Sequence, residues 1–143
     1  MKGIVLIISV FLSAVSFGQD KITWIFSFDQ ELSAISIDAD IEEGWHLYSQ
    51  FLDNEFGPIP TRFEYVRNES YKLVGGTLEP QSIKEYDENF EGDMSFFKDK
   101  VSFVQKVENT NATSIEGVVT YMVCNDEMCM PPVDLEFSIP IKE

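Results

Sequence analysis

Apolar and polar residues alternate with a period of two through most of this chain, a pattern typical of strands that bury one face. The alternation predicts two strands first, over residues 21–28 and 32–41. The aromatic run 45–48 predicts a short third strand, and residues 62–66 and 71–74 predict two more. Helical periodicity is nearly absent, so we expect an all-β domain.

From residue 100 onward the alternation is regular again and predicts three further strands. The residues expected on the buried face of each are Val101, Phe103, Gln105 and Val107, then Val119, Tyr121 and Val123, and finally Val133, Leu135, Phe137 and Ile139. Aromatic residues at alternating positions are expected in the core, namely Trp24, Phe26, Phe63, Phe103 and Phe137.

Glycine and proline divide these strands. The Gly-Pro-Ile-Pro run at residues 57–60 would interrupt any central strand, and the glycine pair at 75–76 predicts a turn or a bulge. Residues 84–97 are acidic and aromatic, and we expect a long loop there with brief strand content. About eight short strands separated by such turns predict an immunoglobulin-like antiparallel β-sandwich, with a closed barrel as the alternative.

The first 18 residues have the features of a secretion signal. Lys2 supplies a positive charge, residues 4–15 are apolar but too few to span a bilayer, and Ser-Phe-Gly at 16–18 matches a cleavage site between small residues. We therefore expect cleavage near Gly18 and one exported domain over residues 19–143. No later apolar run approaches the roughly 18–20 residues of a membrane helix, so no membrane insertion of the mature chain is expected.

The chain carries a formal net charge of −15, with Asp and Glu scattered along it. Such a field repels phosphate backbones and anionic lipid surfaces, so nucleic acid is not expected as a partner. Protein partners with neutral or basic surfaces remain, and the acidity also favours solubility.

Cys124 and Cys129 are the only cysteines, and four residues separate them between two predicted strands, 119–124 and 129–139. This spacing predicts the closing pair of a hairpin loop, where opposed residues lie close enough for a disulfide. A six-residue ring restricts the unfolded chain by only about 2 kcal/mol, whereas a hairpin tip is open to attack by another protein's thiolate. Structural and redox roles both fit the spacing.

Charge near the cysteines favours one direction of chemistry. Asp126 and Glu127 lie between them and no basic residue adjoins either one, so the thiol pKa values should be raised. Thiols of high pKa attack poorly, and the oxidised pair is then the natural recipient of attack. The sequence favours a relay over an oxidant.

Two alternatives come from other functional classes. Met122, Met128 and Met130 crowd soft sulfur ligands around the cysteine pair, and Cu(I) favours such donors, although alternation should send some of them to opposite faces. The other alternative is a non-catalytic interaction module with a structural disulfide. The only histidine, His46, is interpreted as a packed residue on an apolar strand and not as a metal ligand. No metal and no cofactor belong to the favoured interpretation.

Three segments resemble one known family. Residues 121–132, with the two cysteines followed by a proline pair, resemble the redox hairpin of the N-terminal periplasmic domain of the thiol:disulfide interchange protein DsbD. Residues 44–48 resemble that family's aromatic segment beside the active site, and residues 87–92, Asp-Glu-Asn-Phe-Glu-Gly, resemble its cap loop. The resemblance covers nearly the whole chain after the signal, and the cysteines lie one residue closer than in the best-known members.

The resemblance implies an immunoglobulin-like fold and a periplasmic thiol:disulfide oxidoreductase of the protein-disulfide reductase type. Such a domain takes electrons from a thioredoxin-like domain or a membrane electron carrier, here on a separate polypeptide, and passes them to disulfide isomerase-like acceptors. By position, Cys129 resembles the cysteine that forms mixed disulfides with partners, and Cys124 resembles the one that resolves them.

The same resemblance assigns roles around the pair. Phe90 matches the aromatic cap that shields the sulfurs and swings aside when a partner docks. Asp87 and Glu88 belong to the same loop, with Asn89 directly ahead of Phe90. Flanking aromatic positions are occupied by Tyr48 and by His46, which stands where the family often has a second tyrosine.

Overall fold

The computed structural model describes residues 21–53 and 56–141, so the predicted signal peptide lies outside the described residues. In these ranges the strands are β1 (Ile22–Asp29), β2 (Ala34–Ile41), β3 (His46–Tyr48), β4 (Arg62–Tyr65), β5 (Tyr71–Leu78), β6 (Ile83–Asp87), β7 (Gly92–Phe97), β8 (Lys100–Asn109), β9 (Ser114–Tyr121), β10 (Val123–Cys124) and β11 (Val133–Pro140). The described part of the chain contains no helix long and apolar enough to cross a membrane.

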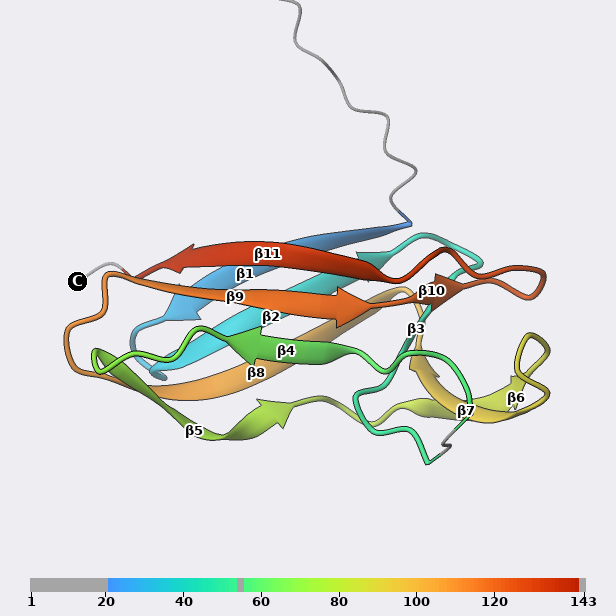
Figure 1. Ribbon diagram of the computed structural model, residues 1–143, viewed down its shortest axis with the longest axis horizontal. Coiled ribbons are helices and arrows are strands. Elements are labelled where there is room, and N and C mark those ends of the chain that lie inside the picture. Colours follow the sequence, from blue (N-terminus) through green and yellow to red (C-terminus); the bar gives the residue numbers. More distant parts are fainter. Residues whose placement is uncertain (1–20, 54–55, 142–143) are drawn as a thin grey trace, which may run out of the picture.

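The strands form three antiparallel sheets with the strand orders β1-β2-β8-β5, β11-β9-β4 and β10-β3-β7-β6. Aromatic rings join the first two sheets: Phe26 of β1 stacks on Phe137 of β11 with ring centroids 4.6 Å apart, and Trp24 meets Phe63 of β4 at 6.2 Å. Figure 1 shows the third sheet at one end of these two layers. The fold is therefore an antiparallel β-sandwich, as predicted.

The main core lies between the two large sheets and follows the alternation of the sequence. Every second residue of β8 from Val101 to Val107 is buried, and this set includes Gln105 as well as its apolar neighbours. The Gln105 amide is satisfied: its Nε2 donates to the carbonyl oxygens of Gly75 and Lys106 at 3.1 and 2.9 Å, and its Oε1 accepts from Thr77 at 2.9 Å. Of the aromatic residues expected in the core, Phe103 and Phe137 are buried, and Trp24, Phe26 and Phe63 are half-buried against them.

The prediction of a long loop at residues 84–97 is wrong, because β6 and β7 pair there as an antiparallel hairpin. The reason is that β6 is the edge strand of its sheet and Ile83 to Tyr86 are all exposed, so this strand shows no alternation. The described ranges hold eleven strands instead of about eight.

Strand β5 runs four residues beyond its predicted end, through the glycine pair, to Leu78. The register against β8 shifts between Val74 and Leu78, so the glycines form a bulge inside the strand. Leu32, predicted as a strand residue, lies in the β1–β2 turn and is 72% exposed.

The two strands predicted around the cysteines are interrupted. Strand β9 ends at Tyr121, and β10 pairs with β3 of another sheet. On the returning arm, Cys129 meets Cys124 in an isolated antiparallel bridge, and β11 begins only at Val133. The proline pair at 131–132 lies in this gap, and proline has no N–H to donate to a ladder.

Candidate functional site

The sheet β10-β3-β7-β6 has two apolar faces, because successive residues of a strand point to opposite sides. Leu47, Phe97 and Val123 face the main core. The residues that alternate with them form a separate cluster, called the second core here: Tyr48, Met94, Phe96, Met122 and Cys124, with Leu52, Ile59, Phe90 and Cys129 packed against it. The cysteine pair thus lies in an apolar site of its own at the end of the sandwich.

Cys124 and Cys129 form a disulfide, with their Cα atoms 4.0 Å apart, at the base of a four-residue loop. The two sulfurs differ in access, since Cys124 is 0% exposed and Cys129 is only half-buried. A thiolate arriving from solvent therefore meets Cys129 first.

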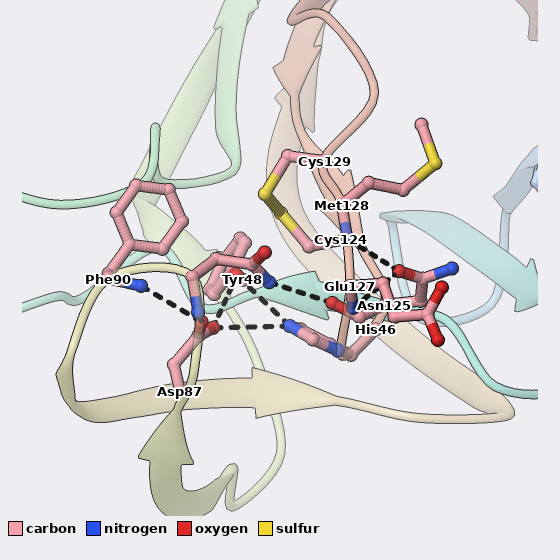
Figure 2. Close-up of polar contacts among 10 residues, drawn as sticks. His46, Tyr48, Asp87, Phe90, Cys124, Asn125, Glu127, Met128 and Cys129 are labelled. Carbon is pink, nitrogen blue, oxygen red and sulfur yellow. Dashed lines mark hydrogen bonds and ion pairs between the residues drawn. A yellow bond between two sulfur atoms is a disulfide. The ribbon is translucent and has the colours of Figure 1, made fainter.

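Asn125 shapes the loop between the cysteines. Its side-chain Oδ1 accepts hydrogen bonds from the backbone N–H groups of Glu127 at 2.9 Å and Met128 at 2.7 Å (Figure 2), and its own N–H donates to the Met128 carbonyl oxygen at 2.9 Å. Asparagine favours such turns because its side chain hydrogen-bonds the backbone two residues on. Asp126 and Glu127 are exposed at the tip and make it acidic.

A buried polar cluster lies beside the disulfide. The Tyr48 hydroxyl donates to Asp87 Oδ2 at 2.5 Å, and His46 Nε2 lies 3.0 Å from the Tyr48 oxygen and 3.3 Å from the same carboxylate oxygen, as Figure 2 shows. Three elements contribute to this arrangement: β3 presents His46 and Tyr48 on one face, β6 ends at Asp87, and β10 places Cys124 directly opposite His46.

Burial and these contacts shift the pKa values of all three side chains. Burial alone would raise the pKa of Asp87, but hydrogen bonds from Tyr48 and from the Asn89 N–H, together with His46, hold it below its ordinary 3.8. Burial lowers the pKa of His46 from 6.5 and outweighs the opposite effect of Asp87, while burial and the Asp87 contact raise that of Tyr48. At neutral pH the cluster therefore holds an ionised carboxylate, a neutral imidazole and a phenol.

The cap loop, residues 87–92, joins β6 to β7 next to the disulfide. Asp87 Oδ1 accepts the backbone N–H groups of Asn89 at 2.8 Å and Phe90 at 3.3 Å. The Asn89 side chain donates to the Asn125 carbonyl oxygen at 2.7 Å and so ties the cap loop to the cysteine loop. The half-buried ring of Phe90 packs against the second core, edge-on to Tyr48 with centroids 6.0 Å apart.

The structure brings together most of the residues singled out from the sequence, namely Cys124, Cys129, Phe90, Tyr48, His46 and Asp87. Glu88 lies in the same loop, is exposed, and makes none of the hydrogen bonds described above. Sequence reasoning missed the contact of Asn89 with Asn125 and the place of Met94 and Phe96 in the second core. The alternation of Met94 and Phe96 in 92–97 was the available signal for the latter.

The sulfur ligands considered for Cu(I) do not gather in one place. Met122 shares the second core with Cys124, as expected for residues two apart on a strand. Met130 packs against the main core instead, and Met128 is 50% exposed at the loop tip. Among the described residues no three His, Cys, Asp or Glu side chains form a group that could hold a metal.

Comparisons with known proteins give a consistent picture. The family model for the N-terminal part of the thiol:disulfide interchange protein DsbD matches residues 14–140. A sequence comparison with curated proteins finds no match.

Among solved structures, the chain resembles the reduced DsbD N-terminal domain of Neisseria meningitidis, with a TM-score of 0.65 and 17% identity over 86% of this chain and 87% of that one. It also resembles the structure of the complex between the DsbD and PilB N-terminal domains of N. meningitidis, with a TM-score of 0.62 and 15% identity over 87% of each chain. A third likeness is to the N-terminal periplasmic domain of ScsB from Proteus mirabilis, with a TM-score of 0.59 and 12% identity over 83% of this chain and 45% of that one. These likenesses confirm the immunoglobulin-like form of the sandwich.

Proposed function

The chain belongs to the family of DsbD N-terminal domains, and from this premise we propose that it is a thiol–disulfide exchange relay that acts through the Cys124–Cys129 pair. The observation that carries the proposal is the unequal burial of the two cysteines in one apolar site, with Cys124 fully buried and Cys129 half-buried at the base of the cysteine loop. A disulfide whose only task was to close a loop would need neither a second core nor a cap loop beside it.

The exchange step follows from this asymmetry. A partner thiolate attacks Cys129 Sγ, the bond between the two cysteines breaks, and Cys124 leaves with the electron pair as a thiolate that takes up a proton. A mixed disulfide now joins the partner to Cys129. The partner's second thiolate then attacks the partner sulfur of the mixed disulfide, and Cys129 leaves as a thiolate. The partner departs oxidised, and the Cys124–Cys129 pair is left reduced. With an oxidised acceptor the same steps run in reverse, and Cys124 resolves the mixed disulfide.

The cap loop would control access to this chemistry. With Phe90 packed on the second core, small oxidants and unrelated thiols are kept from the sulfurs, and a docking partner displaces the ring. Asp87 would hold the loop in its closed form through the N–H groups of Asn89 and Phe90.

The partners we propose are proteins with thioredoxin-like folds. One related structure is a complex between a DsbD N-terminal domain and the N-terminal domain of PilB, which supports a thioredoxin-like partner for this chain. We further propose a disulfide isomerase-like acceptor, a thioredoxin-like domain or membrane electron carrier as donor, and export to the periplasm after cleavage near Gly18, with residues 19–143 as the working domain.

Two other functions are weaker. A structural disulfide is favoured by no feature beyond the bond itself, since a six-residue ring stabilises the fold by only about 2 kcal/mol. Cu(I) binding would need the methionine and cysteine sulfurs to converge, and Met122, Met128 and Met130 lie in three different surroundings.

Trapping tests the relay directly. The Cys124→Ser variant is mixed with a thioredoxin-like domain that keeps one active-site cysteine, activated as its mixed disulfide with thionitrobenzoate, and whose own resolving cysteine is replaced by serine. Cys129 attacks the partner sulfur, thionitrobenzoate leaves, and the resulting protein–protein mixed disulfide should be stable and visible on a non-reducing gel. The Cys129→Ser variant is the matched control and should trap far less, because Cys124 is buried. Equal trapping by both variants, or by neither, would rule the relay out.

A further inference from the structure

The exchange reaction requires that a buried thiol, Cys124, gain and lose a proton. Cys124 is 0% exposed, so each time it resolves a mixed disulfide it must first lose its thiol proton away from water. Burial raises the pKa of a thiol, and Asp87 and Asp126 add negative charge nearby. Resolution is therefore slow unless a neighbouring side chain accepts the proton.

The position opposite Cys124 in the ladder between β10 and β3 belongs to His46. Directly opposed residues of an antiparallel pair point to the same face with Cβ atoms about 4.5–5.5 Å apart, so His46 is the titratable side chain next to Cys124 on the neighbouring strand. His46 is 6% exposed and is the only histidine of the chain.

We propose that His46 is the general base for Cys124, taking its thiol proton during resolution and returning it when Cys124 is the leaving group. In resolution, the S–H proton passes to the imidazole, the Cys124 thiolate attacks Cys129 Sγ, the bond from Cys129 to the partner sulfur breaks, and the partner departs as a thiolate. The imidazolium then loses its proton to solvent. The inference rests on the proposed function, since it assigns a role within that exchange.

The surroundings of His46 suit this role. Its Nε2 is committed to Tyr48 and Asp87, and because the ionised carboxylate only accepts, Nε2 carries the proton. The ring nitrogen that keeps a lone pair and can accept a further proton is then Nδ1. When the imidazole takes a second proton, the carboxylate of Asp87 at 3.3 Å stabilises the positive charge.

The charges that face His46 act in both directions. Asp87 from β6 and Asp126 from the cysteine loop raise its pKa, Lys98 after β7 lowers it, and burial lowers it most. Tyr48 contributes a neutral hydroxyl, and Phe96 of β7 contributes only its ring, at 4.7 Å between centroids. The net lowering keeps His46 unprotonated, and thus able to accept a proton, at neutral pH.

A chromogenic disulfide separates the two steps. Reduced protein mixed with one equivalent of 5,5′-dithiobis(2-nitrobenzoate) releases one thionitrobenzoate when Cys129 attacks and a second when Cys124 resolves, and both are followed at 412 nm by stopped flow. In the His46→Gln variant, where glutamine can donate to Asp87 but cannot take a proton, we expect the second phase to slow by about 10-fold or more at pH 7, with the first phase within about twofold. Tyr48→Phe is the matched control, because it removes a neighbouring polar group that is not a base, and its second phase should slow less.

The pH profile is a second readout that needs no variant. In the wild-type protein the second phase should rise with the titration of a group of pKa below 6.5 and reach a plateau near neutral pH. In His46→Gln it should keep rising tenfold per pH unit up to the pKa of the thiol. A second phase of unchanged rate and profile in His46→Gln, or a wild-type profile without a plateau, would overturn the role of His46. Failure of the relay itself would look different. Two equivalents of thionitrobenzoate would still be released in this assay, but the trapping experiment would give no mixed disulfide with a thioredoxin-like protein.

Discussion

The hydrogen bond from the Asn89 side chain to the Asn125 carbonyl oxygen is the contact we expect to hold the cap loop closed. It spans 2.7 Å, is half-buried, and joins the loop that carries Phe90 to the loop that carries the disulfide. Asn89→Ala removes this bond and leaves the backbone N–H of residue 89 free to donate to Asp87 as before. The substitution therefore loosens the cap without removing its aromatic ring.

The size of the effect follows from the bond. A neutral hydrogen bond within a protein contributes about 0.5–1.5 kcal/mol net, which changes an equilibrium constant by about 2- to 13-fold. If the cap must open before Cys129 is attacked and is closed most of the time, the exchange rate scales with the open fraction. We therefore expect about fivefold faster reduction of the disulfide in Asn89→Ala.

The assay is the pseudo-first-order reduction of the oxidised protein by excess dithiothreitol, with free thiols trapped at timed intervals. Asn111→Ala is the matched control, because Asn111 is an exposed asparagine in the loop between β8 and β9. Figure 1 shows this loop at the end of the sandwich away from β10, β3, β7 and β6. A rate in Asn89→Ala equal to those of the control and the wild type would refute the idea that this bond keeps the cap closed.

Three further predictions concern the cap, the buried carboxylate and the packing of the sandwich. Phe90→Ala should be reduced faster than wild type, because the half-buried ring packs on the second core, and an unchanged rate would show that another residue covers the sulfurs. In Asp87→Asn, urea unfolding between pH 7 and 2 should depend less on pH. The folded-state pKa of Asp87 is lowered from 3.8, so its stabilising effect is complete above that value and lost as the pH falls through the folded-state pKa; equal slopes for variant and wild type would contradict the ionised state. Gly117→Ala should lower the free energy of unfolding by about 1–3 kcal/mol, because an added Cβ would overlap the Glu64 carbonyl oxygen and lie 2.5 Å from Phe137 Cζ, on the two strands that flank β9 in its sheet. A variant of wild-type stability in urea would show that β4 and the Phe137 ring can shift to make room.

The sequence predicts those parts of the fold in which one face of a strand is buried. Alternation located β1, β2, β8 and β9 because each has one face in the main core. It failed at β6, where exposed residues on both faces leave no period, and at the glycine bulge of β5, where the strand continues through a turn-like pair.

The candidate site also has one part that the sequence predicts and one part that it does not. The cysteine hairpin is a local feature, and its spacing alone predicted the disulfide that the structure contains. The contact of His46 and Tyr48 with Asp87 joins residues about forty positions apart. It depends on β7 pairing with both β3 and β6, which no periodicity of a single strand reveals. Only the family resemblance placed these residues near one another in advance.

The reduction potential of the Cys124–Cys129 pair tests the central claim most directly. The mature protein would be equilibrated with glutathione or dithiothreitol buffers of known potential, and the oxidised fraction read by thiol trapping. A relay that exchanges with thioredoxin-like partners should have a potential above about −300 mV, in the range of exchange-active pairs. A potential well below that value would mean that the disulfide is purely structural and would contradict a role in thiol–disulfide exchange.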